Sequence, residues 1–410
     1  MELIRSDHEL YDVLRRPALP QYCDVRPQAI ARCSSVEDVV EALASARAAG
    51  LRVAPRGGGH CFAGRSSTTG LMLDLSGLST ISVDSGLATI GAGARLASVY
   101  HGLHEHGLTL PAGCGPTVGI AGLTLGGGLG LLGRKYGLTC DRLVAATVVL
   151  ADGNVVECDA EREADLFWAL RGAGGGQFGV VTSLVYAAVP SPAATRFTIT
   201  WPRERAAEVI DAWQTWAPDA PDDITASLMV TADRTEVFGA TLVPLDPGPF
   251  ADGDIQLREG LTWPELKRSL SEGEPAGGVV HSKSEFFAAP LPRAAITELL
   301  AGGCELNFTP MGGAYNRVAG DATAFAHRTE RFLLEHVGPD RNAVRRSWSI
   351  AHPHASGHVY PNFPDVDLAD WAIAYHGSNY PRLQEIKAKY DPHTVFSFPQ
   401  SLRSDYRVGR

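Results

Sequence analysis

Pro55-Arg56-Gly57-Gly58-Gly59-His60 is the stretch of this chain that decides its fold. Three consecutive glycines let the backbone approach a bulky ligand closely and direct several N–H groups at a pyrophosphate. The histidine that follows them is a nucleophile at the edge of whatever the glycines hold. The stretch therefore predicts a site for a large phosphate-bearing cofactor of the flavin type.

The segments around this glycine loop predict an α+β domain. Ser34 or Ser35 is expected to cap a helix that runs to about Ala49, and residues 51–55 are expected to form a buried strand that leads into the loop. The segments after the loop are expected to be three short strands and a helix, at 71–75, 80–84, 88–91 and 96–106. A short βα unit thus delivers the glycines.

Composition limits the classes of partner. A length of 410 residues indicates roughly two domains. Lys and Arg number 36 against 46 Asp and Glu, with no basic block, so neither nucleic acid nor an anionic membrane is an expected partner. The start lacks the pattern of a signal peptide, and no apolar run is long enough to span a bilayer. Seven scattered cysteines favour reduced thiols and a cytoplasmic location.

A second glycine-rich region covers residues 113–133, and its part 128–133 matches the dinucleotide-binding fingerprint. That fingerprint requires a preceding buried strand and an acidic residue about 20 positions later at a strand end. Here the upstream segment is broken by glycines, and Asp152 falls in a hairpin turn. We therefore expect a second loop against the same ligand, and we keep a nicotinamide-dependent dehydrogenase as a distant alternative.

Taken together, these segments resemble the FAD-linked oxidases of the vanillyl-alcohol oxidase superfamily, specifically the berberine-bridge-enzyme-like group with its p-cresol methylhydroxylase (PCMH)-type FAD domain. The likeness covers almost the whole chain and is weakest between about 190 and 340. The segments that carry it are 56–60, 111–123, 126–130, 136–138, 165–172, 178–182, 360–363, 375–379 and 390–392.

The resemblance implies an α+β fold with a two-part FAD-binding domain and a substrate domain made of an antiparallel sheet backed by helices. Residues 1–189 would form the first part of the FAD-binding domain, 190–357 the substrate domain, and 358–410 a segment that returns to the FAD-binding domain. Within the substrate domain, strands are expected at 197–201, 226–231 and 237–243, and helices at 205–217, 294–301 and 323–336.

For His60 the resemblance implies a covalent bond from the imidazole to a methyl carbon of the flavin ring. The alternative is a histidine that only caps the loop or binds a phosphate. Many family members attach the flavin a second time through a cysteine, at the position that Gly115 occupies here. Cys114 stands one residue early, which in an extended segment turns its side chain to the opposite face, so a second bond through Cys114 is not expected.

The residues expected to contact FAD lie in the glycine-rich loops and in the returning segment. They are Arg56, Gly57, Gly58, Gly59, His60, Cys61, Gly64, Gly113, Thr117, Val118, Gly119, Gly122, Leu123, Gly127, Gly130, Tyr136, Gly179, Val181, Tyr375 and Asn379. The resemblance assigns Gly179 and Val181 to the adenine end, whereas a lone cysteine such as Cys61 also fits simple packing. His376 departs from the family's paired tyrosines, which leaves the contact beside Tyr375 open.

Tyr360 is the expected catalytic residue, because the family's Tyr-x-Asn string places that tyrosine beside the substrate. Alcohol oxidation needs a group that takes the hydroxyl proton, and the alternative is a packed core tyrosine. His352, His354 and His358 lack a carboxylate pattern and a fourth ligand, so no metal is expected.

The expected function is an FAD-linked oxidase that passes a hydride from an alcohol, sugar or amine carbon of a small molecule to FAD and then to dioxygen. The resemblance places Val118 near the ring, at a position where oxidases of this family tend to carry a small residue, and so implies dioxygen as the acceptor and hydrogen peroxide as the product. Secondary metabolism is the expected setting, and a homodimer is compatible with the family. The alternative is a flavin-bound cyclase, tailoring enzyme or non-oxidative scaffold of the same fold.

Overall fold

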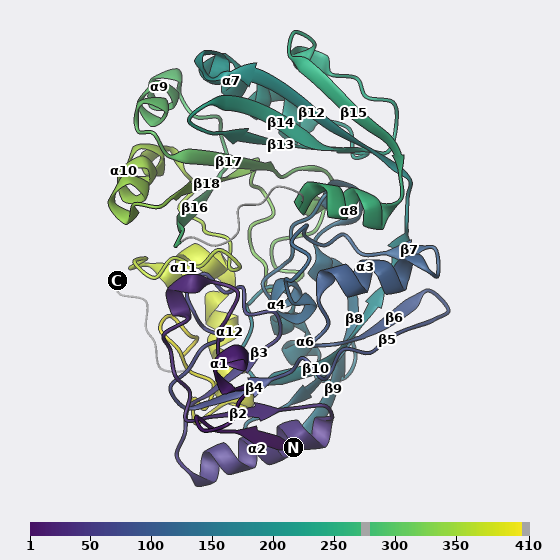
Figure 1. The fold of residues 1–410 in the computed structure, drawn as a ribbon, viewed down its shortest axis with the longest axis vertical. Coiled ribbons are helices and arrows are strands. Elements are labelled where there is room, and N and C mark those ends of the chain that lie inside the picture. Colours follow the sequence, from purple (N-terminus) through teal and green to yellow (C-terminus); the bar gives the residue numbers. More distant parts are fainter. Residues whose placement is uncertain (272–278, 404–410) are drawn as a thin grey trace.

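The computed structural model describes residues 1–271 and 279–403, and it contains two large hydrophobic cores, one above the other in Figure 1. The lower core draws mainly on residues 29–194 and 371–402, and the upper core on residues 197–351. The α+β fold class is confirmed. The last residues of the returning segment, 404–410, lie outside the described part of the chain.

The glycine loop follows a strand at the edge of a small sheet in the lower half. This sheet has the order β1-β2-β4-β3, in which β2, β4 and β3 run parallel. Its strands are β1 (Glu2–Ile4), β2 (Ala29–Arg32), β3 (Val53–Arg56) and β4 (Leu71–Asp74). The connecting helix α2 (Val36–Ala48) begins with a capping box between Ser35 and Asp38, as the sequence predicts.

A second sheet in the lower half is antiparallel, with the order β5-β6-β10-β8-β9. Its strands are β5 (Ile81–Asp84), β6 (Leu87–Gly91), β8 (Leu143–Val149), β9 (Val155–Asp159) and β10 (Val180–Ala187). The nearby helices are α3 (Leu96–His104), α4 (Ile120–Leu125), α5 (Gly133–Tyr136) and α6 (Ala164–Leu170). Helix α4 precedes the fingerprint-like glycines, so the strand that a Rossmann site requires is absent there.

The upper half is one antiparallel sheet of seven strands. Its order is β15 (Asp254–Leu261), β12 (Ala194–Pro202), β14 (Arg234–Thr241), β13 (Ile224–Val230), β17 (Glu305–Pro310), β18 (Phe332–Gly338) and β16 (His281–Phe287). Figure 1 shows α7 (Ala206–Trp216), α9 (Arg293–Ala301) and α10 (Arg341–Ala351) on its outer side. The opposite face of the sheet therefore looks toward the lower half.

The predicted helix over 323–336 is wrong. The segment contains an irregular stretch followed by strand β18, which pairs with β17 and β16 on its two sides. Phe332 and Leu334 enter the upper core, whereas Leu333 between them packs in a separate cluster on the other face. A central strand with both faces buried gives a continuous apolar run, which periodicity cannot distinguish from a helix.

Two segments join the halves. Helix α8 (Trp263–Ser271) follows β15 of the upper sheet, and its Trp263 and Leu266 pack in the lower core. Helices α11 (Trp371–His376) and α12 (Tyr380–Tyr390) return to the lower half, where Figure 1 shows them in yellow beside the purple N-terminal elements. Among the described residues, no helix is long and apolar enough to cross a bilayer.

Candidate active site

A cavity of about 900 Å³ lies between the glycine-rich loops of the lower half and the inner face of the seven-stranded sheet. This volume is at the upper end of the range for small-molecule sites. Most of the predicted site residues line it, namely Gly57, Gly58, Gly59, His60, Cys61, Gly64, Gly113, Thr117, Val118, Gly119, Gly122, Leu123, Gly130, Gly179, Val181 and Tyr360. The structure therefore brings loops far apart in sequence to one site.

Five predicted contacts do not line the cavity: Arg56, Gly127, Tyr136, Tyr375 and Asn379. The guanidinium of Arg56 is buried and donates to the carbonyl oxygens of the α1 (Tyr11–Leu14) turn. Tyr375 accepts a hydrogen bond from the backbone N–H of Asp365, and Asn379 donates to carbonyls of the 320–324 loop. The side chains of Arg56, Tyr375 and Asn379 therefore make hydrogen bonds to backbone groups outside the cavity lining.

The glycine loop has the space and the donors that a flavin dinucleotide needs. A Cβ at Gly58 would lie 2.2 Å from the nitrogen of Gly119, so the two loops meet backbone to backbone. The N–H groups of Gly58, Gly59 and His60 have no hydrogen-bond acceptor within the described residues. A Cβ at Gly122 would meet no protein atom within 4 Å. Free N–H groups beside open space fit a bound pyrophosphate.

His60 presents a neutral imidazole to the cavity. Its Nε2 lies 2.9 Å from Oγ1 of Thr117, and Nδ1 has no partner in the described part of the chain. Burial lowers the pKa of His60, and the nearby charge of Arg95 lowers it further. A neutral ring with one free nitrogen is the form in which histidine acts as a nucleophile.

Lys267 of helix α8 anchors the loop that carries Cys114. Its ammonium donates to the carbonyl oxygens of Ala112 at 2.8 Å and Gly113 at 3.1 Å. The sulfur of Cys114 lies 3.7 Å from the same nitrogen, although Cys114 also lines the cavity. A buried lysine on a helix that follows the outermost strand of the upper sheet thus fixes the backbone of the lower half at Ala112 and Gly113, a contact that the sequence did not reveal.

Tyr360 lies in a nest of three N–H donors. Its phenolic oxygen accepts hydrogen bonds from the backbone N–H of Gly128, the backbone N–H of Leu129 and the side-chain amide of Asn362, each at 3.0 Å. Its own hydrogen has no acceptor among the described residues, so it is available to a ligand. Burial raises the pKa of Tyr360, and the three donors oppose that rise.

Tyr315 also lines the cavity, but its hydroxyl group is already engaged in hydrogen bonds with the backbone of Gly130. Its hydroxyl donates to the carbonyl of Gly130 at 2.8 Å and accepts from the N–H of the same residue at 3.0 Å. Burial raises the pKa of Tyr315 above the ordinary range. Of the two tyrosines, Tyr360 alone keeps a proton to exchange.

The sheet supplies small hydroxyl groups that sequence reasoning missed. Thr225 and Ser227 of β13 and Thr309 of β17 line the cavity, together with Leu333 of β18. Thr225 and Ser227 are two residues apart on one strand, so their side chains share a face. That alternation could have identified them, but nothing in the sequence indicates which face of β13 looks toward the cavity.

Family models match at both ends of the chain. A model described as an FAD binding domain matches residues 27–159, and one described as berberine and berberine like matches residues 359–403. The chain is 34% identical to the uncharacterized FAD-linked oxidoreductase YgaK of Bacillus subtilis (strain 168), over 92% of this chain and 91% of YgaK.

Solved structures give the same result for the fold. BBE-like 1 of Physcomitrella patens superposes with a TM-score of 0.93 at 27% identity, covering 99% of this chain and 97% of that protein. A chitooligosaccharide oxidase superposes with a TM-score of 0.89 at 25% identity, covering 98% of this chain and 97% of the oxidase. Both halves of the molecule, and not the FAD-binding half alone, share the architecture of these proteins.

Proposed function

The chain belongs to the berberine-bridge-enzyme-like family of FAD-linked oxidoreductases, and on that basis we propose that it oxidises an alcohol carbon of a neutral small molecule and passes the electrons to dioxygen. The observation that carries this proposal is the nest around Tyr360. Three N–H donors converge on a phenolic oxygen at the cavity wall, and the phenol's own hydrogen lacks a protein acceptor. Such a group can take a substrate's hydroxyl proton, because its anion would be held by three hydrogen bonds.

The remaining residues bind and orient. FAD supplies the acceptor for a hydride and, through it, a route for electrons to dioxygen. His60 is proposed to hold the cofactor covalently through Nδ1, since Nε2 is occupied by Thr117. The free N–H groups of the glycine loop would bind the pyrophosphate. Val118 is a small residue in the cavity wall and would leave room near the ring for dioxygen.

The charge of the cavity favours an alcohol or sugar over an amine. The described residues that line it include Arg52 and Arg65 but no Asp or Glu. A protonated amine would enter without a counter-charge, which is costly in a buried site. Hydroxyl groups, in contrast, can pair with Ser227 and Thr309. A natural product of secondary metabolism with several hydroxyls is the substrate class that we propose.

The first test is acid precipitation of the purified protein. A yellow pellet and an FAD-sized adduct on the His60 peptide, but none on the Cys114 peptide, are expected. His60→Ala is the control and should release its FAD into the supernatant. A colourless wild-type pellet would leave His60 as a loop contact.

The second test mixes the protein anaerobically with a panel of alcohols, sugars and amines. A substrate should bleach the flavin, and air should restore the colour with one equivalent of hydrogen peroxide. Conversion of a substrate without bleaching would support the cyclase alternative. Bleaching that air does not reverse would identify a dehydrogenase that uses another acceptor.

A further inference from the structure

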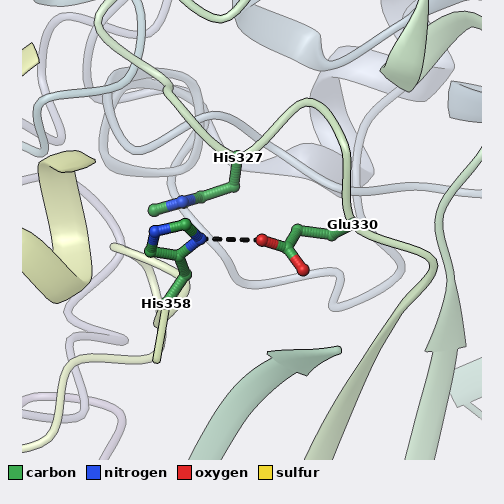
Figure 2. Close-up of side chains that lie close together, drawn as sticks. All are labelled: His327, Glu330 and His358. Atoms are coloured by element: carbon green, nitrogen blue, oxygen red, sulfur yellow. Dashed lines mark hydrogen bonds and ion pairs between the residues drawn. The ribbon is translucent and has the colours of Figure 1, made fainter. Parts of the chain in front are cut away.

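A second cluster of reactive side chains lies outside the cavity. Figure 2 shows His327 and Glu330, from the segment before β18, converging with His358, which is two residues before Tyr360. One ligand atom from each of the three residues can be chosen so that all lie within 4.8 Å of one another. None of the three lines the cavity. The cluster therefore requires an explanation other than flavin chemistry.

His327 is held in a metal-binding tautomer. Its Nε2 lies 2.9 Å from the carbonyl oxygen of Tyr375, and because a carbonyl can only accept, Nε2 carries the hydrogen. Nδ1 is therefore a bare lone pair, yet it is fully buried and has no partner among the described residues. Metal-binding histidines are typically oriented by such a backbone hydrogen bond on the far nitrogen.

Glu330 is a buried carboxylate without a Lys or Arg partner in the described part of the chain. Its side chain is 1% exposed, and its one ion-pair contact is His358, whose Nδ1 lies 2.7 Å from Oε1. Oε2 is buried and has no partner among the described residues. Arg328, two residues before it, pairs with Asp141, and Arg331, the next residue, pairs with Asp219. A buried carboxylate with one free oxygen is costly unless a cation reaches it.

The histidine–carboxylate pair of His352 and Glu285 provides a comparison for the cluster of His327, Glu330 and His358. Glu285 is also 1% exposed and pairs with Nδ1 of a histidine, His352, at 2.5 Å. The ring of His352 stacks on Trp348, and among the described residues no second histidine ring packs against it. In the cluster, by contrast, the rings of His327 and His358 lie 4.7 Å apart between centroids. The second imidazole is what converts a histidine–carboxylate pair into a set of three ligands.

We propose that His327, Glu330 and His358 bind one divalent transition-metal ion, with Zn²⁺ as the ion that fits the donors best. Two imidazoles and one carboxylate form a set that zinc uses with a fourth position for water. A single carboxylate is too little for Ca²⁺ or Mg²⁺, which take mostly oxygen ligands. The ion would take the place of the hydrogen between His358 and Glu330, and a neutral His358 would then carry its hydrogen on the ring nitrogen away from the ion.

The geometry needs a small contraction. Zinc–ligand distances of about 2.0–2.2 Å place the ligand atoms of a tetrahedral site roughly 3.4 Å apart, closer than the widest spacing seen here. His358 is about one-third exposed, so its ring can rotate and an ion can enter from solvent. The bound ion would tie the loop before β18 to the segment that carries Tyr360. Its role would be to brace that segment rather than to contact substrate.

The test uses the flavin-loaded protein, stripped with a chelator and then titrated with ZnCl₂ alone. After gel filtration, elemental analysis should find one zinc per chain, and the melting temperature should rise by several degrees. His358→Ala should weaken zinc binding at least tenfold and abolish the melting shift. His327→Gln, which keeps a donor toward Tyr375, should do the same without removing the ion pair.

The matched control is His352→Ala, which removes the comparable histidine of the Glu285 pair. It should bind zinc like the wild type. Zinc that binds equally well to the His358 and His327 variants would belong to other groups, such as the free thiols, and would overturn the proposal. So would a wild-type protein that retains no more zinc than the His358 variant. Neither result depends on a known substrate.

Discussion

The two walls of the cavity are built from different parts of the chain. The lower wall is backbone: Gly58 and Gly119 approach so closely that neither tolerates a Cβ. The upper wall is side chains: Ser227 and Thr309 project from two strands of a sheet. The lower wall comes from short contiguous loops, whereas the upper wall comes from residues more than eighty positions apart. The lower wall is therefore specified by residues close together in each loop, and the upper wall by the pairing of strands distant in the chain.

The most damaging change to this arrangement should be Gly58→Ala. Its Cβ would lie 2.2 Å from the nitrogen of Gly119 and 2.8 Å from the carbonyl oxygen of Thr117, and backbone cannot move aside cheaply. The loops must separate, so flavin content per chain should fall more than tenfold and the melting temperature should drop. Absorbance of the purified protein and a thermal melt measure both.

Gly122→Ala is the matched control, because its added Cβ would meet no protein atom. The variant should fold like the wild type when flavin is absent. Flavin incorporation should still decrease, since the new methyl group enters the cavity. A Gly58→Ala protein with full flavin and an unchanged melting temperature would contradict the backbone description of this wall.

Tyr360→Phe tests the point where the two walls meet. Removal of a general base costs about 10²- to 10⁴-fold in rate, and we expect a loss in the lower part of that range for flavin reduction in an anaerobic stopped-flow experiment. Flavin content should stay near that of the wild type, because a phenyl ring keeps the packing against Phe325 and Phe363.

The pH profile separates a base from a packing residue. Since burial holds the pKa of Tyr360 above its ordinary 10, the ionised fraction rises with pH throughout the range from 7 to 9. The reduction rate of the wild type should therefore climb across that range, and the profile of Tyr360→Phe should be flatter. A flat wild-type profile would show that Tyr360 donates a hydrogen bond in its neutral form and does not take the proton.

The glycine loop of the lower wall can be predicted from the sequence because its motif consists of consecutive residues. Gly57 to His60, the cap at Ser35 and the rejection of a Rossmann site all depend on neighbours in the chain. The upper wall depends on which face of β13 is buried and on the pairing of β18 in the sheet centre. Neither can be read from neighbouring residues, which is why the sequence predicts a helix over 323–336 where the structure has a strand.

The same reason explains the missed side chains. In the sequence His358 stands near His352 and His354, but the structure places it beside His327 and Glu330 instead. Lys267 reaches the Ala112 carbonyl from a helix of the other half. Contacts of this kind follow from the tertiary fold and leave no spacing pattern in the sequence.

A smaller effect should follow from changes in the upper wall. Ser227→Ala and Thr309→Val each remove one hydroxyl from the cavity without altering the glycine loops. A neutral hydrogen bond contributes about 1 kcal/mol, so kcat/KM for the best substrate should fall roughly fivefold, mainly through KM. Thr198→Val on β12, which does not line the cavity, should leave both constants unchanged. Equal losses in all three variants would indicate a general effect on the sheet.

The smallest expected effect is on the pH dependence of stability. It comes from a titratable group of the upper half, Glu285. Burial raises the pKa of Glu285 on β16 from 4.5 to about 7. Between these values the unfolded chain has already released the proton that the folded chain retains, so the contribution of Glu285 to stability falls as pH rises from about 5 to 7 and is level above. Glu285→Gln removes this contribution, so the melting temperature of the variant relative to that of the wild type should rise by a few degrees between pH 5 and pH 8. Gly122→Ala, in a wall without carboxylates, should keep the wild-type slope; an unchanged slope in Glu285→Gln would show that the carboxyl is ionised at pH 5 in the folded protein.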